Sequence, residues 1–135
     1  MKERIMLRTF RYGDPRRRGE GLRVGTTRRP PRGVRRSRWR AEGYFDVWFP
    51  IVAPSINLMR RFRNRMITRA DYRTFCASYE RELLSSAESR QALDLLAVLS
   101  TRTPISVGCY CEDESWCHRS HLRKLIARRA HGATQ

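Results

Sequence analysis

This sequence is poor in lysine, in acidic residues and in long apolar runs, and these shortages narrow the classes of protein it can belong to. Lys2 and Lys124 are the only lysines, and no glycine-rich loop with its phosphate-binding lysine is present. No serine-centred elbow appears, and no pair of carboxylates stands out as general acid and base. No apolar run approaches the length of a membrane span. The commonest signatures of phosphate-binding loops, serine hydrolases and transmembrane helices are therefore excluded.

The start of the chain also lacks the pattern of a secretory signal, because charged residues lead directly into a short strand-like segment. The expected location is the cytoplasm, where the four cysteines remain thiols rather than forming a disulfide framework. A chain of 135 residues suits one domain with a core of a few strands and helices. We expect a single domain over 1–135, with an arginine-rich part at 1–42 and a helical part containing Cys-His-Arg at 55–130.

Arginine supplies nearly all of the positive charge. The chain holds 29 basic and 13 acidic residues, which gives a formal net charge of +16. The first 42 residues hold 15 of the basic residues and 4 of the acidic ones. Such a field attracts polyanions, and guanidinium groups bind phosphate in a bidentate manner, although genome composition can produce the same excess. The charge favours nucleic acid or a phosphate-bearing small molecule as partner, and no membrane is expected.

The order of strands and helices follows from apolar runs, caps and prolines. Strands are predicted at residues 4–10, 22–27 and 105–109. Helices are predicted to begin at the serine or threonine caps Ser55, Thr68, Ser85 and Ser115. The aromatic stretch at 44–54 is interrupted by prolines, so it is predicted to be an ordered and largely buried loop.

Residues 103–120 hold the densest concentration of reactive side chains, with three of the four cysteines and one of the three histidines. The pattern predicts a strand, a short acidic loop and the start of a helix. Cys117, His118 and Arg119 are expected in the first helical turn, where backbone N–H groups are unpaired. A thiol there can have a lowered pKa, and the same N–H groups can hold a phosphate or a carboxylate. The segment therefore predicts a ligand site.

Two of these residues also have a purely structural interpretation. Cys109 ends an apolar strand, where a free cysteine commonly behaves as a small buried hydrophobe. His118 shares the helical register of Leu122, which also suits a hydrogen-bonded core histidine. Both interpretations stay open at the level of sequence.

A metal site is a further alternative, because five potential ligands lie close together: Cys109, Cys111, Cys117, His118 and His121. Their spacing differs from that of the common zinc fingers, which need two close pairs separated by a longer loop. Adjacent residues such as Cys117 and His118 also diverge by about one hundred degrees on a helix. We therefore expect no metal and no cofactor, and no Cys111–Cys117 disulfide under reducing conditions.

The cysteine-rich segment resembles a known family. Val-Gly-Cys-Tyr-Cys at 107–111 with Cys-His-Arg-Ser at 117–120 is similar to the C-terminal signature of the domain-of-unknown-function 488 family, in its YeaO-like branch. The similarity extends along nearly the whole chain. Further matching positions are a middle motif at 52–55, Leu58, Phe75, Tyr79, Glu82 and Leu83, and an early arginine-containing loop at 23–24, Arg28 and 31–33.

The resemblance implies a compact α/β domain with a small, mostly parallel sheet flanked by about four helices. It also implies a site assembled from the early arginine loop and the Cys-His-Arg turn. The sequence departs from many relatives at Thr27, Pro30 and Cys111, where aspartate, tryptophan and glutamate are common. Any acid role at those positions is therefore not carried over to this chain.

The leading hypothesis is a cytoplasmic protein with an anion- or phosphate-binding pocket, in which a cysteine acts on a nucleotide or nucleic-acid-related substrate. Cys117 or Cys109 would be the reactive thiol, and His118 would move the proton. The anion would be held by Arg28, Arg32, Arg119 and Ser120. The alternative is a non-enzymatic basic module that binds nucleic acid, and a third interpretation is a hydrogen-bonded helix start without chemistry. Whether the chain is an enzyme stays open.

Overall fold

The architecture is built on a parallel sheet in which the last strand of the chain lies between two earlier ones. The computed structural model describes residues 4–133. The strands have the order β1-β4-β2-β3, and every neighbouring pair is parallel. Their bounds are β1 Leu7–Arg11, β2 Leu22–Gly25, β3 Val47–Trp48 and β4 Ile105–Cys109. The expected α/β class is therefore confirmed.

Four α-helices accompany this sheet within residues 4–133. Their bounds are α1 Ile56–Phe62, α2 Arg69–Leu84, α3 Ala87–Arg102 and α4 His118–Ala133. Three short 3-10 helices complete the elements: η1 Arg36–Arg38, η2 Pro50–Val52 and η3 Glu114–Trp116. As predicted, Ser55 and Thr68 cap α1 and α2, because their hydroxyls accept hydrogen bonds from the first-turn amides. None of the helices in this part of the chain is long and apolar enough to span a membrane.

Two helix starts differ from the prediction. The cap of α3 is Ser86 rather than Ser85, because its hydroxyl is the one that accepts from an amide of the first turn. The start of α4 is His118 rather than the expected Ser115, because Asp113 caps a separate 3-10 turn first. The predicted loop at 44–54 also contains β3, whose two residues are too few to show a strand period.

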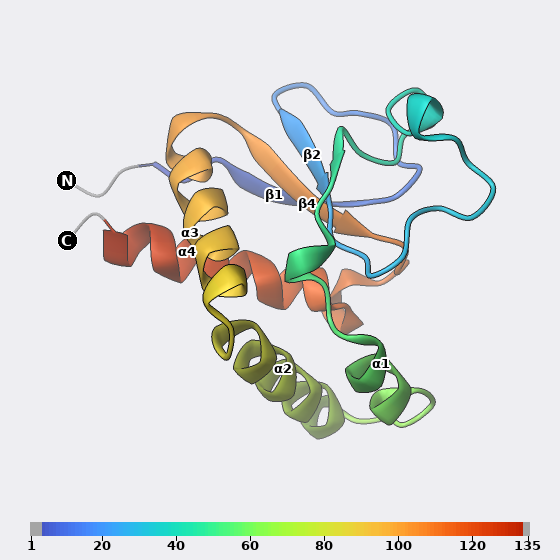
Figure 1. Cartoon of the computed structure of the whole chain (residues 1–135), viewed down its shortest axis with the longest axis vertical. Helices are drawn as coiled ribbons and strands as arrows, with labels where there is room; N and C mark the ends of the chain where they lie inside the picture. Colours follow the sequence, from blue (N-terminus) through green and yellow to red (C-terminus); the bar gives the residue numbers. More distant parts are fainter. Residues whose placement is uncertain (1–3, 134–135) are drawn as a thin grey trace.

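The helices pack on one face of the sheet. α4 packs against β1 and β4, and α3 packs on α4, while Figure 1 shows α2 and α1 continuing the helical layer away from the sheet. Alternate side chains of the strands point into this layer. They join helix residues in one apolar core, which includes Leu7, Val24, Ile105, Val107, Leu93, Leu96, Leu122 and Ile126. This packing holds the start of α4 against the end of β4.

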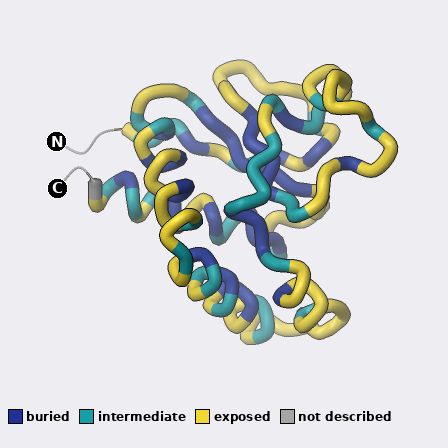
Figure 2. Tube along the Cα trace, viewed as in Figure 1, coloured by how far each residue is buried: buried dark blue, intermediate teal, exposed yellow. Residues whose placement is uncertain are grey.

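The opposite face of the sheet carries a buried ion pair. Arg23 of β2 is fully buried, pairs with Glu20, and lies 4.4 Å from the centre of the Phe10 ring. Ser106 of β4 donates a hydrogen bond to the same carboxylate at 3.2 Å. The loops before and after β2 cover these groups, and Figure 2 shows much of those loops as an exposed rim around buried strands. This ion pair and a second apolar cluster of Phe10, Tyr12 and Phe45 therefore cover the face that has no helix.

Candidate functional site

The loop between β4 and α4 brings two cysteines together at the carboxyl edge of the sheet. β4 ends at Cys109, and the chain passes through η3 before α4 begins at His118. Asp113 shapes this turn, because its carboxylate accepts hydrogen bonds from the amide and the hydroxyl of Ser115. The turn returns Cys117 to the strand end, where its Sγ atom lies 2.6 Å from Sγ of Cys109. Local loop geometry therefore creates a thiol pair.

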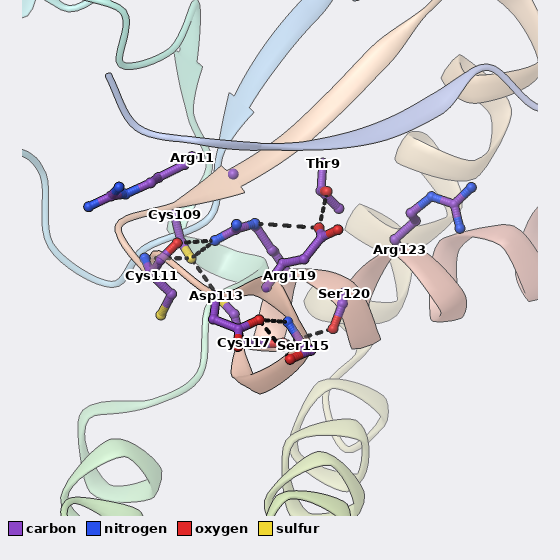
Figure 3. A network of polar contacts seen from close by, with 12 residues as sticks. Thr9, Arg11, Cys109, Cys111, Asp113, Ser115, Cys117, Arg119, Ser120 and Arg123 are labelled. Carbon is purple, nitrogen blue, oxygen red and sulfur yellow. Dashed lines mark hydrogen bonds and ion pairs between the residues drawn. The ribbon is translucent and has the colours of Figure 1, made fainter. Parts of the chain in front are cut away.

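A buried guanidinium lies directly against this pair. Nη1 of Arg119 donates to Sγ of Cys109 at 3.1 Å and to the Cys111 carbonyl oxygen at 2.7 Å. The amide of Cys111 donates to the same sulfur at 3.4 Å. Nε of Arg119 lies 3.9 Å from a carboxylate oxygen of Glu114, which also accepts from the hydroxyl of Thr9. Figure 3 shows Arg119 extended between the cysteines and Thr9. The site thus holds a permanent cation beside a thiol.

His118, the first residue of α4, is held in one orientation. Its Nε2 atom lies 2.8 Å from the carbonyl oxygen of Thr26 and 3.2 Å from the hydroxyl of the same residue. A carbonyl oxygen can only accept, so Nε2 carries the proton. Nδ1 is then the acceptor, and it lies 3.7 Å from Sγ of Cys117. The imidazole therefore presents its lone pair to the thiol pair.

Cys109, Cys111 and Cys117 form what we call the sulfur cluster, and the pKa of Cys111 is shifted in the opposite direction to those of Cys109 and Cys117. The pKa of Cys111 is lowered, chiefly through the neighbouring Cys109 and Cys117 thiols. Burial opposes this shift, and the positive charge nearby adds to it. The same contacts raise the pKa of Cys109 to about 11 and raise that of Cys117 strongly. Arg119 contacts Cys109, whereas the lowered pKa is that of Cys111. The three thiols therefore titrate as one coupled group rather than independently.

Burial keeps His118 neutral near pH 7. Its pKa is lowered to about 4, chiefly because burial penalises the charged imidazolium, and the hydrogen bond to Thr26 only partly opposes this. A neutral imidazole can accept a proton. Cys109 and Cys117 are each 1% exposed, whereas Cys111 is exposed. The site therefore combines a neutral base, two buried thiols and one accessible sulfur.

Three of these residues could also hold a metal ion. The ligand atoms of Cys109, Cys117 and His118 lie within 4.8 Å of one another. Two sulfurs on one tetrahedral zinc ion are about 3.8 Å apart, given Zn–S distances of about 2.3 Å. The separation of 2.6 Å between the two sulfurs here is shorter than that. The two sulfurs are therefore closer together than one zinc ion would hold them.

The four residues expected to hold an anion lie in different places. Arg119 contacts the sulfur cluster, and Ser120 donates to the carbonyl oxygen of Cys117 at 3.1 Å. Arg28 instead donates to two backbone carbonyls that precede α1, and it lines a hollow beside that helix. Arg32 is exposed. Among residues 4–133, the hydrogen bonds and ion pairs of the sulfur cluster include neither Arg28 nor Arg32.

Two further residues belong to this site. The sequence indicated Cys111 only as an alternative metal ligand or disulfide partner, and it assigned Thr26 no role. Cys111 carries the accessible sulfur, and its spacing from Cys109 was the available signal, because alternation places both on one side of an extended chain. Thr26 orients His118 from 92 residues away. No local signal marks Thr26, since only the pairing of β2 with β4 brings it to the site.

Comparison with known proteins adds a family assignment. The family model DUF488-N3a, described as the active DUF488-N3 subclade, matches residues 7–130. This range contains all four strands and the sulfur cluster. No curated protein and no solved structure matches the chain.

Proposed function

This chain belongs to the DUF488 family, and from that membership and the site geometry we propose a cysteine-dependent enzyme that acts on an anionic substrate. The observation that carries the proposal is the contact between the Arg119 guanidinium and Sγ of Cys109 within the sulfur cluster. Burial alone would keep the thiols protonated, because it disfavours their charged form. A cation at hydrogen-bonding distance favours one thiolate instead.

Cys111 is the sulfur that a substrate meets in this proposal. Cys109 and Cys117 are buried, whereas Cys111 is exposed and has the lowered pKa. In this proposal the neighbouring buried thiols keep the pKa of Cys111 low. The proposed nucleophile therefore differs from the sequence hypothesis, which favoured Cys117 or Cys109, and those two residues become supporting groups.

The proposed step forms a bond between the Cys111 sulfur and an electrophilic atom of the substrate, and it breaks the bond from that atom to its leaving group. Consuming the negative charge lowers the pKa values of Cys109 and Cys117, because the charge that raised them is gone. One of these thiols gives its proton to the leaving group. Water then cleaves the covalent bond and returns a proton to the buried thiolate. His118 can relay this proton, since its Nδ1 atom faces Cys117.

Positive charge around the exposed sulfur supports an anionic substrate. Arg11 donates to the carbonyl oxygen of Tyr110 at 3.3 Å, and Figure 3 shows its side chain on the Cys111 side of the loop. The net charge of +16 attracts anions to the whole surface. A phosphate- or carboxylate-bearing molecule is therefore the substrate class that we propose.

Alkylation of the folded protein by iodoacetamide tests the proposed nucleophile. Mass spectrometry would identify the modified cysteine over a series of pH values. Cys111 should react first and should stay reactive well below pH 7, because its pKa is lowered. An ordinary cysteine, with a pKa of about 8.5, slows about tenfold for each pH unit below that value. A Cys111 rate with that ordinary profile would contradict the proposal.

Two controls test whether this reactivity arises from the thiolate of the sulfur cluster. A Cys76→Ser variant should leave the Cys111 rate unchanged, because Cys76 is a buried residue of α2 outside the sulfur cluster. Metal analysis of the purified protein covers the remaining alternative. If Cys111 reacts only after a chelator removes a bound metal ion, the cluster is a metal site and the nucleophile proposal fails.

A further inference from the structure

A second site lies beside α1, where four arginines line a hollow of about 590 Å³. Arg28 and Arg29 follow β2, whereas Arg60 and Arg63 lie at the end of α1. We infer that this arginine hollow binds a nucleotide through both its phosphate groups and its base. The inference is independent of the cysteine chemistry, because no residue of the sulfur cluster lines the hollow.

The arginine hollow carries positive charge that the described chain does not neutralise. Arg29, Arg60 and Arg63 form no side-chain hydrogen bond or ion pair with any residue of the 4–133 range. None of the residues that line the hollow is acidic. Other arginines of this protein do find carboxylates, as Arg16 does at 2.7 Å from Asp46. Gathering like charges at one place is unfavourable until an anion joins them, so the hollow is suited to an anionic ligand.

One of the four arginines is held in place before any ligand arrives. Nη2 of Arg28 donates to the carbonyl oxygen of Ala53 at 2.8 Å, and its Nε donates to that of Pro54 at 3.3 Å. These bonds tie the loop after β2 to the segment before α1. Arginines from two distant parts of the chain are thereby brought to one hollow. A cation held in this way loses less side-chain freedom when a ligand binds.

The hollow also has an apolar surface that is partly open to solvent. Met59 is 47% exposed and Ile56 is 38% exposed. Phe62 and Phe75 line the same hollow and pack edge to face, with ring centres 5.4 Å apart. Methionine and aromatic side chains provide a polarisable surface on which a base can stack. The hollow therefore suits a ligand with a charged end and a flat body.

A nucleotide has both of these features. Guanidinium groups bind phosphate oxygens in a bidentate manner, and the volume of the hollow is in the range of small-molecule sites. An inorganic anion would leave the apolar surface uncovered, and an acidic peptide offers no flat base. A free nucleotide and one nucleotide of a single strand present the same chemistry, so the experiment includes both.

Isothermal titration calorimetry of the full chain tests the inference with ATP, adenosine, tripolyphosphate, a single-stranded oligonucleotide and polyglutamate. ATP or the oligonucleotide should bind at least about tenfold more tightly than adenosine or tripolyphosphate, because only they reach both the arginines and the apolar surface. Tighter binding of ATP indicates a free nucleotide, and tighter binding of the oligonucleotide indicates a strand. Equal binding of tripolyphosphate or polyglutamate would overturn the inference, as would failure of both nucleotide ligands to bind.

Substitutions then locate the binding. Arg60→Gln and Arg63→Gln should each weaken nucleotide binding about tenfold, since each removes a charge-assisted contact. Arg65→Gln is the matched control, because Arg65 is an exposed arginine of the same segment that does not line the hollow, and its screened charge should matter about twofold or less. Equal losses in all three variants would mean binding by overall charge and would overturn the site. Cys111→Ser should bind normally, so failure of the enzymatic proposal does not affect this test.

Discussion

Nη1 of Arg119 lies 3.1 Å from Sγ of Cys109, and both side chains are buried at the junction of β4 and α4. A guanidinium cannot be deprotonated in a protein, so the sulfur faces a permanent positive charge. A thiolate in this buried cluster should therefore depend on Arg119 more than on any exposed arginine.

Arg119→Gln should make the cysteine reaction slower at low pH. The substitution removes the cation beside Cys109, so the pKa of the sulfur cluster should rise by at least about one unit and alkylation at pH 6 should fall about tenfold. Arg123→Gln is the matched control, because Figure 3 shows Arg123 on the same helix but apart from the cysteines. The rates are measured by mass spectrometry, and equal rates for both variants would refute the role of Arg119.

The buried imidazole of His118 should make the protein less stable as the pH falls from 6.5 toward 4. Its pKa is lowered from 6.5 to about 4 by burial. Between these values the unfolded chain binds the extra proton, so stability increases with pH and is lost as the pH falls. The loss between pH 7 and pH 5 should be about 2 kcal/mol, at about 1.4 kcal/mol per pH unit. Urea unfolding at the two pH values measures it.

A His118→Gln variant serves as the control for this pH dependence. Its stability can be lower at every pH, since the hydrogen bond to Thr26 changes, but the slope between pH 5 and pH 6.5 should largely disappear. Glu20, Asp46 and Glu80 also have lowered pKa values, and their contributions are lost only as the pH falls into the acid range of carboxylates. An unchanged slope in the variant would assign the effect to other groups.

Glu20→Gln should destabilise the protein by about 3–5 kcal/mol, because it leaves the guanidinium of Arg23 buried without its partner charge. Arg16→Gln removes an arginine from a more exposed pair with Asp46, and this control should cost about 1 kcal/mol or less. The free energy of unfolding in urea distinguishes the two cases. Similar small losses would show that the buried pair is not important for stability.

Gly108→Ala should destabilise the sheet just before the first cysteine of the site. A Cβ atom on Gly108 would overlap with the ring of Phe10, so one of the two must move, at a cost of about 1–3 kcal/mol. Gly132→Ala is the control with the opposite sign, because no atom lies within reach of a Cβ there and alanine in the last turn of α4 favours the helix by at most about 1 kcal/mol. Thermal unfolding should therefore move in opposite directions for the two variants.

Features that depend on neighbours along the chain were predictable from the sequence. The capping box of Thr68 and Asp71 marks the start of α2, because both of its hydrogen bonds join residues three positions apart. The apolar run 105–109 marks β4 for the same local reason. The starts of α3 and α4 were misplaced where a second capping residue, Ser86 or Asp113, lies close to the predicted one. The family signature also identified the cysteines and the histidine of the site.

The sequence alone thus determined the helices, most of the strands and the chemistry available at 107–120. Only the tertiary structure decided which groups meet. Thr26 reaches His118 because β4 pairs with β2, and Arg28 joins the α1 segment instead of the cysteines. Burial of two sulfurs leaves Cys111 as the accessible one. These outcomes depend on the free energy of packing whole faces of the sheet and helices, which no spacing along the chain encodes locally.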